Sequence, residues 1–213
     1  MNAALAELIG TFTLVFIGAG TGAVVGGEPG GVIAVALAHG LAIATSIYAW
    51  GAVSGCHINP AVTFGLAITG KIDWPKAVTY WIAQLAGAAV AAFLLAYLLG
   101  AGHALGETTG SLTESSPVKT IILEGVLTFF LVTAVLGSAV AGRNGNAVGF
   151  AIGLVVAMDI LMAGPLTGAS MNPARTFGPA LASGHLSYLW MYIVGPLAGG
   201  GAAAILYDRL FLK

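Results

Sequence analysis

The feature that most limits how this chain can fold is a series of long stretches that lack Asp, Glu, Lys and Arg. Five of them run over residues 8–27, 29–70, 77–106, 125–142 and 176–207. A further candidate, residues 144–164, is interrupted only by Asp159. A helix that crosses a bilayer needs about 20 apolar residues. Charged residues are 7% of the chain, against about 25% in soluble domains, so its solvent must be lipid.

The lengths of these stretches predict two kinds of helix. We expect six membrane-spanning helices, near residues 3–25, 32–52, 75–99, 118–141, 146–166 and 187–210. Two segments, 59–70 and 172–183, are too short to span, because a helix of that length covers only about 16 Å, half of the hydrocarbon core. The predicted fold class is an all-α membrane protein with six transmembrane helices and two re-entrant half-helices.

The basic residues indicate how the spans are oriented. If the spans alternate, five basic residues fall on one side: Lys71, Lys76, Arg143, Arg209 and Lys213. The excess of Lys and Arg on that side places both termini in the cytoplasm. The short segments outside the first and last spans are typical of a prokaryote, which favours the cell membrane as the location.

An internal repeat relates the two halves of the chain. Residues 7–15 resemble residues 124–132, and residues 54–65 match residues 167–178. Each half holds three predicted spans, an odd number, so the second half is inverted relative to the first. Inverted repeats with broken helices at matching places indicate a pathway at the middle of the bilayer.

Each short segment opens with the same motif, Asn59-Pro60-Ala61 in the first and Asn172-Pro173-Ala174 in the second. Asn caps a helix and Pro suits its first turn, so the alternative for each copy is a helix cap alone. Two helix N-termini that meet in the membrane bring two positive dipole ends together, which repels cations. The two amides can also donate to a passing water oxygen and turn its hydrogens outward, which interrupts proton hopping.

Two such motifs in a six-span inverted repeat resemble the aquaporin (major intrinsic protein) family, over essentially the whole chain. Residues 39–42 and 160–165 look most like the plant tonoplast intrinsic protein branch. The resemblance implies a passive channel for water and small neutral solutes that excludes protons and ions. It also implies a homotetramer in the lipid bilayer, with one pore per subunit. We expect one channel domain, 1–213, with inverted repeats at 1–105 and 117–213.

Arg175 follows the second motif directly, where the first repeat has Val62. An arginine in an apolar span is costly unless it faces water or a partner. The resemblance assigns it to the outer constriction of a pore, together with His39, Ile160 and Ala169. The alternatives are an arginine that extends to the lipid headgroups and a histidine that only packs.

The constriction differs from that of strict water channels, which have Phe at the position of His39 and His at that of Ile160. One wall is then apolar and the opening is wider, so we expect ammonia to pass as well as water, with urea and hydrogen peroxide as further candidates. Relatives that conduct ammonia have a histidine in the loop after the third span. His103 is in that loop, but Thr109 takes the expected place.

The nearest alternative function is a glycerol or urea facilitator. Glycerol facilitators have Asp where Thr176 stands and a basic residue where Ala180 stands, but Ile193 departs toward the glycerol type. A secondary transporter would need paired ionisable residues at the midplane, and Glu7 and Glu124 are the available ones. The sequence lacks a nucleophile beside a base and a metal-ligand cluster, so we expect no enzyme and no cofactor. The net charge of −1 gives no reason to expect a nucleic-acid partner.

Five further residues have predicted roles around the pore. The resemblance places Cys56 and His57 in the cytoplasmic vestibule, although a buried, inert thiol is an equal alternative. Glu7 and Glu124 hold matching repeat positions, and an ionised carboxylate only accepts hydrogen bonds. We interpret them as braces for the two re-entrant loops, whose backbone donors are free. For Asp159, a hydrogen bond to the second re-entrant loop is the simplest role.

Overall fold

The computed structural model describes residues 1–100 and 104–212. Within these residues it is helical and has no strand. The helices, in chain order, are α1 (Asn2–Leu14), η1 (Val15–Ala19), α2 (Gly20–Val25), α3 (Gly31–Ser54), α4 (Pro60–Ile68), α5 (Trp74–Leu99), α6 (Ser111–Ser115), α7 (Pro117–Val135), η2 (Leu136–Val140), η3 (Gly145–Ala147), α8 (Val148–Thr167), α9 (Pro173–Ser183) and α10 (Met191–Phe211).

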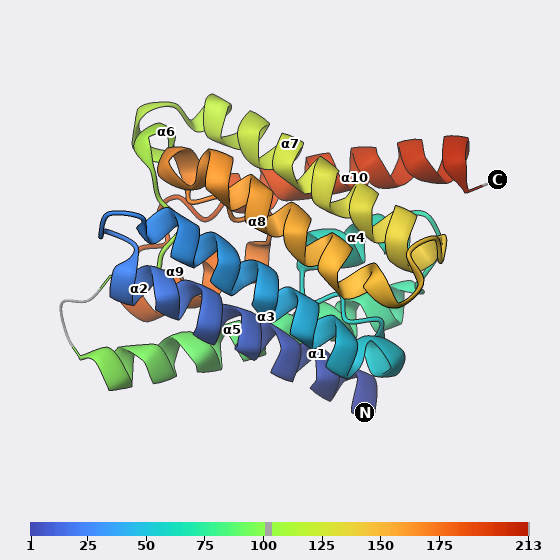
Figure 1. Ribbon diagram of the computed structural model, residues 1–213, viewed down its shortest axis with the longest axis horizontal. Helices are drawn as coiled ribbons and strands as arrows, with labels where there is room; N and C mark the ends of the chain where they lie inside the picture. The colour runs from blue at the N-terminus through green and yellow to red at the C-terminus, as the bar shows by residue number, and fades with distance from the viewer. Residues whose placement is uncertain (101–103, 213) are drawn as a thin grey trace.

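Six helical spans run side by side through the part of the chain that the structure describes, and both termini lie at the same end of the bundle (Figure 1). Among the described residues, five spans are long and apolar enough to cross a membrane: Asn2–Val25, Gly31–Ser54, Trp74–Leu99, Pro117–Val140 and Gly145–Thr167. The sixth, α10, has 21 residues, and it carries Asp208 and Arg209 near its C-terminal end. It begins at Met191, later than predicted, because residues 187–190 form a turn. The predicted all-α fold with six spans is confirmed.

Two short helices, α4 and α9, enter the bundle from opposite ends without crossing it (Figure 1). Each begins at a proline after an asparagine cap. Asn59 Oδ1 accepts from Ala61 N at 2.8 Å, and Asn172 Oδ1 accepts from Ala174 N at 3.0 Å. At 1.5 Å per residue, the 9 residues of α4 and the 11 of α9 cover about 14 and 17 Å. They are the two predicted half-helices.

Glycines allow the spans to approach closely. A Cβ on Gly40 of α3 would lie 2.7 Å from the carbonyl oxygen of Gly153 in α8. A Cβ on Gly195 of α10 would lie 2.7 Å from the carbonyl oxygen of Ile121 in α7. A larger residue at either glycine would therefore push two spans apart, as is typical where small residues line the contact between membrane helices.

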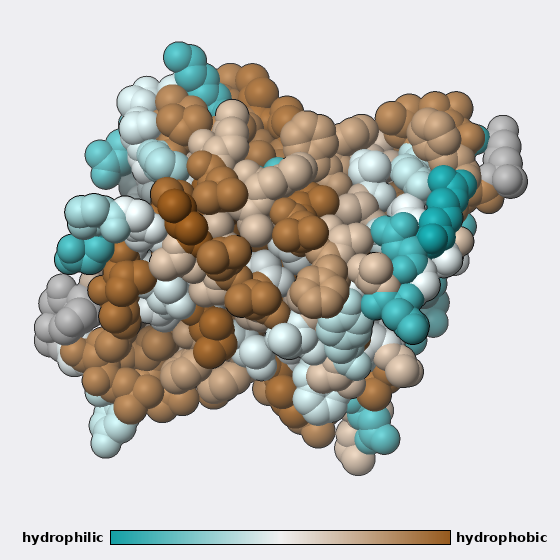
Figure 2. Space-filling view, viewed as in Figure 1, coloured by the Kyte–Doolittle hydropathy of each residue, from teal (hydrophilic) through white to brown (hydrophobic). Residues whose placement is uncertain are grey.

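The outside of the bundle is apolar between two polar ends. Figure 2 shows a hydrophobic band across the middle of one face and hydrophilic residues toward both ends of the longest axis. Large apolar side chains that are exposed on α3 and α8 include Leu37, Leu41, Phe150 and Leu154. In lipid such a surface needs no cover, and helices satisfy their own backbone hydrogen bonds there. The chain is an integral, multi-pass membrane protein.

Candidate pore and its constrictions

The two asparagines of the Asn-Pro-Ala motifs link the N-terminal ends of α4 and α9. The amide of Asn59 donates to Met171 O at 2.8 Å, and the amide of Asn172 donates to Ile58 O at 2.9 Å, so each side chain crosses to the other loop. Both asparagines are buried. An asparagine amide has two N–H groups, and one of each pair therefore remains for a solute between the helix ends.

Glu7 of α1 contacts the first re-entrant loop. Its Oε1 accepts from Ser54 Oγ at 2.6 Å and from His57 N at 2.9 Å. Its Oε2 accepts from Ile58 N at 2.6 Å and from Gln84 Nε2 at 2.8 Å. The residue is 0% exposed, so these four donors replace the water that a buried carboxylate has lost.

Glu124 of α7 makes a matching set of contacts to the second re-entrant loop. Thr167 Oγ1 donates to Glu124 Oε1 at 2.7 Å, and Ser170 N donates to the same oxygen at 3.0 Å. Met171 N donates to Oε2 at 2.8 Å. Each of the two buried acids therefore accepts from the two N–H groups that directly precede an Asn-Pro-Ala motif.

Two tyrosines contact the same loops, and the sequence analysis missed them. Tyr80 of α5 donates through its hydroxyl to Ser54 O at 2.7 Å, and Tyr192 of α10 donates to Thr167 O at 2.6 Å. Both side chains are buried. Each lies near the start of the span that follows a half-helix, so a repeat comparison carried beyond the motifs would have found the pair.

The two re-entrant loops also share a rare backbone conformation. The φ angle is +49° at Cys56 and +43° at Ile58, and it is +44° at Ala169 and +54° at Met171. A non-glycine residue in the left-handed region costs about 1–3 kcal/mol and persists only where its surroundings hold it. The amides of Ile58 and Met171, two of these four residues, donate to the two buried acids.

Arg175 and His39 meet on the side of the asparagine pair that faces away from the termini. Arg175 Nε donates to His39 Nε2 at 3.1 Å, and Arg175 Nη1 donates to Gly106 O at 2.6 Å. His39 Nδ1 lies 2.8 Å from Val35 O, so the ring carries its proton on Nδ1 and accepts on Nε2. Gly18 makes room for the ring, because a Cβ there would lie 2.6 Å from His39 Nε2.

This geometry separates the two interpretations of Arg175. The guanidinium is bound by two acceptors inside the protein, and the residue is 4% exposed. Its side chain does not extend to the headgroups. The contributions of Gly106 and Gly18 were not predicted, because one acts through a backbone carbonyl and the other through the absence of a side chain.

Three spaces in the described part of the chain share lining residues. An inner cavity of about 590 Å³ lies toward the termini, and an outer cavity of about 540 Å³ lies toward the other end. A central void of about 20 Å³ lies between them. Ile160 and Arg175 line both the outer cavity and the void, and Asn59 and Asn172 line both the void and the inner cavity. A water molecule needs about 10–15 Å³, so the void has room for about one.

The remaining predicted residues are distributed around these spaces. Cys56 and His57 line the inner cavity, although Cys56 is only 6% exposed. Ala169 is buried in the second re-entrant loop. Thr109 lines the outer cavity, whereas His103 lies outside the described residues.

Asp159 of α8 differs from the prediction made for it. It is 3% exposed, and its Oδ2 has no hydrogen-bond partner among the residues that the structure describes. The expected donors in the second re-entrant loop, Ser170 N and Met171 N, bind Glu124 instead. The acid on α7 has already taken the free donors of the loop.

Replacing Asp159 with asparagine is expected to stabilise the protein by about 1–3 kcal/mol, because a neutral amide of the same shape costs less to bury without a partner than a carboxylate does. The change should appear as a higher melting temperature of the purified protein in detergent. Asp159→Ala, which also removes the shape, is the control. A melting temperature for Asp159→Asn at or below that of the wild type would contradict this expectation.

The fold and this row of cavities are those of a membrane channel. A family model described as "Major intrinsic protein" matches residues 1–207. The chain therefore belongs to the major intrinsic protein family, the aquaporins, as its motifs predicted.

Known relatives and a solved structure agree with this assignment. The chain is 46% identical over 226 residues to "Aquaporin TIP4-4" of Zea mays, covering 100% of this chain and 87% of that protein. It is 44% identical over 225 residues to "Aquaporin TIP1-1" of Zea mays, covering 100% and 88%. The aquaglyceroporin from Plasmodium falciparum superposes with a TM-score of 0.87 at 27% identity, over 98% of this chain and 96% of that one. The protein is a passive channel for water and small solutes and not an enzyme.

Proposed function

We propose that water crosses the protein through the central void, between the asparagine pair and a four-residue constriction. The constriction consists of His39, Ile160, Ala169 and Arg175. The observation that carries the proposal is the size and lining of the void, which is about 20 Å³ and is lined by both asparagines and by Arg175. A path this narrow forces molecules to pass in single file.

The same residues support the exclusion of ions and protons. Arg175 presents a fixed positive charge, and the N-terminal ends of α4 and α9 add partial positive charge beside the asparagines. A hydrated cation would have to shed its water shell to enter the void, against these charges. The free amide N–H groups of Asn59 and Asn172 donate to the oxygen of the same water, so its hydrogens point outward and a proton wire is interrupted.

Osmotic shrinkage of liposomes that contain the purified protein tests water conduction directly. We expect shrinkage at least about tenfold faster than that of empty liposomes, with a weak temperature dependence, because an open aqueous path avoids dissolving water in lipid. The measurement is light scattering after an osmotic step at several temperatures. A rate equal to that of bare lipid would contradict the proposal.

We also propose that ammonia uses this path. Ile160 makes one wall of the constriction apolar, and Arg175 supplies donors that a neutral ammonia molecule can accept from. We expect an ammonium gradient to raise the internal pH of protein-containing liposomes faster than that of empty ones, recorded with an enclosed pH dye. Ile160→His, which restores the residue of strict water channels, should slow this uptake while water flux persists. Uptake no faster than that of empty liposomes would contradict the ammonia proposal.

Glycerol is a second candidate solute, supported by Ile193 and by the superposition on an aquaglyceroporin. Thr176 stands where glycerol facilitators have Asp, and its hydroxyl is already bonded to Thr108 Oγ1 at 2.8 Å. The hydroxyl is therefore engaged within the protein. Swelling of the same liposomes in a glycerol gradient, compared with their water flux, tests glycerol as a solute. Swelling no faster than that of empty liposomes would exclude it.

The remaining expectations concern support, assembly and orientation. We propose that the two buried glutamates brace the re-entrant loops, that Cys56 and His57 line the cytoplasmic vestibule, and that the inverted repeats cover 1–105 and 117–213.

We also propose a homotetramer with both termini in the cytoplasm. The plant relatives give no support to the expected cell-membrane location, and the orientation alone is retained.

A further inference from the structure

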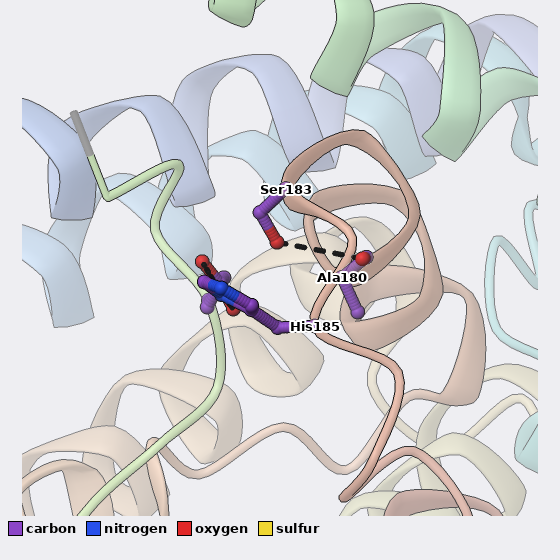
Figure 3. A network of polar contacts seen from close by, with 4 residues as sticks. Ala180, Ser183 and His185 are labelled. Carbon is purple, nitrogen blue, oxygen red and sulfur yellow. Dashed lines mark hydrogen bonds and ion pairs between the residues drawn. The ribbon is translucent and has the colours of Figure 1, made fainter. Parts of the chain in front are cut away.

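A contact between a histidine and a glutamate lies at the rim of the outer cavity. His185 Nδ1 lies 3.1 and 3.2 Å from the two carboxylate oxygens of Glu107. Figure 3 shows His185 beside the last turn of α9, where Ser183 Oγ donates to Ala180 O, with its ring directed toward the connection that leads into α6. His185 and Glu107 line the outer cavity together with Arg175.

The two partners differ in exposure. The side chain of His185 is 72% exposed, whereas that of Glu107 is only 16% exposed. Within the described residues, the hydrogen bonds of the Glu107 carboxylate are those to His185. A largely buried carboxylate that loses its donor is attracted to another cation that lines the same cavity, because leaving the charge unpaired is costly.

The cation available to Glu107 is Arg175. Arg175 is the one permanently charged cationic side chain among the described residues that line the outer cavity. Glu107 directly follows Gly106, whose carbonyl accepts from Arg175 Nη1 at 2.6 Å. Gly106 has a φ of +67° and is packed so closely on Ala19 O that a Cβ would overlap it. The backbone next to Glu107 is therefore held between Ala19 and Arg175.

We infer that His185 keeps the carboxylate of Glu107 off Arg175. This inference rests on the proposed role of Arg175 in the constriction. A carboxylate binds a guanidinium more strongly than a carbonyl does, through two parallel hydrogen bonds. Such a pair would neutralise the charge that excludes cations and would occupy N–H donors that face the solute. His185 is thus a positioning residue for selectivity, although it lies outside the constriction.

Proton leakage into liposomes measures the effect. We expect His185→Leu to raise proton flux about tenfold, because an Arg175 that is paired with Glu107 no longer opposes an entering cation with its full charge. The flux is followed with an enclosed pH dye while valinomycin and potassium clamp the voltage. His185→Lys keeps an N–H donor for Glu107 and should exclude protons as the wild type does. Gel filtration and melting temperature confirm that each variant is folded.

A suppressor distinguishes this inference from a purely structural role. Glu107→Gln combined with His185→Leu removes the competing charge, so proton flux should return to within about twofold of the wild type. Glu114 lines a neighbouring side cavity with His185 but does not line the outer cavity. Glu114→Gln combined with His185→Leu should therefore remain leaky. The inference would be overturned if His185→Leu had the proton flux of the wild type. It would also be overturned if the Glu107→Gln, His185→Leu double variant had a proton flux as high as that of His185→Leu alone.

Arg175→Val, measured beside these variants, separates the inference from the proposal on which it rests. If Arg175→Val excludes protons as well as the wild type, the constriction proposal fails, and the inference fails with it. If Arg175→Val leaks and His185→Leu does not, the constriction proposal stands and only the inference is wrong.

Discussion

Replacing Arg175 with valine, the residue that the first repeat carries at position 62, is expected to raise proton and cation flux by about tenfold or more while water flux continues. The substitution removes the fixed charge beside the central void and leaves His39 Nε2 and Gly106 O without their donor. The constriction then becomes wider and loses its main barrier to cations. Ion flux should rise while osmotic shrinkage, measured on the same liposomes, persists.

Two further substitutions at these positions serve as controls. Arg175→Lys keeps the charge but lacks the planar fork that reaches His39 and Gly106 together, so we expect an intermediate leak. Val62→Ala alters the equivalent position of the other repeat and should leave ion exclusion unchanged. A tight Arg175→Val channel would show that the asparagines and the helix dipoles exclude ions without help from the arginine.

The sequence predicted the pore best at residues whose side chain alone determines their structural role. Two Asn-Pro pairs at matching repeat positions predicted two capped half-helices, and both caps are formed. Glu7 and Glu124 stood out because acids inside spans must find donors. The spans followed from length and hydropathy alone. Each of these inferences needed only the sequence, because the side chain itself carries the information.

The parts that were not predicted depend on how the backbone is folded. Gly106 contributes a carbonyl that any residue has, and its usefulness comes from where the connection crosses the cavity. The wide helical turns η1 and η2 in the first and fourth spans leave no mark in hydropathy. Asp159 has no counterpart in the first repeat. That Glu124 accepts from the donors expected for Asp159, Ser170 N and Met171 N, is seen only in the structure.

Glu124→Leu is expected to be one of the two most destabilising single changes in the pore, together with Glu7→Leu. It leaves Thr167 Oγ1, Ser170 N and Met171 N without their acceptor in a site that is 0% exposed. Each stranded donor costs about 1–3 kcal/mol, so the melting temperature in detergent should fall by about 10 °C or more. Because Ala169 and Met171 then lose the support for their left-handed backbone, osmotic water flux should be lost as well.

Three further variants serve as controls for the Glu124→Leu prediction. Glu28→Leu makes the same chemical change at an exposed acid and should leave both melting temperature and water flux near those of the wild type. Glu7→Leu strands four donors instead of three, so its effect should be at least as large. Glu124→Gln retains one acceptor oxygen and should be intermediate. Wild-type water flux through Glu124→Leu would mean that the tyrosine hydroxyls and the crossed asparagines hold the loops, and that the buried acids are dispensable to the pore.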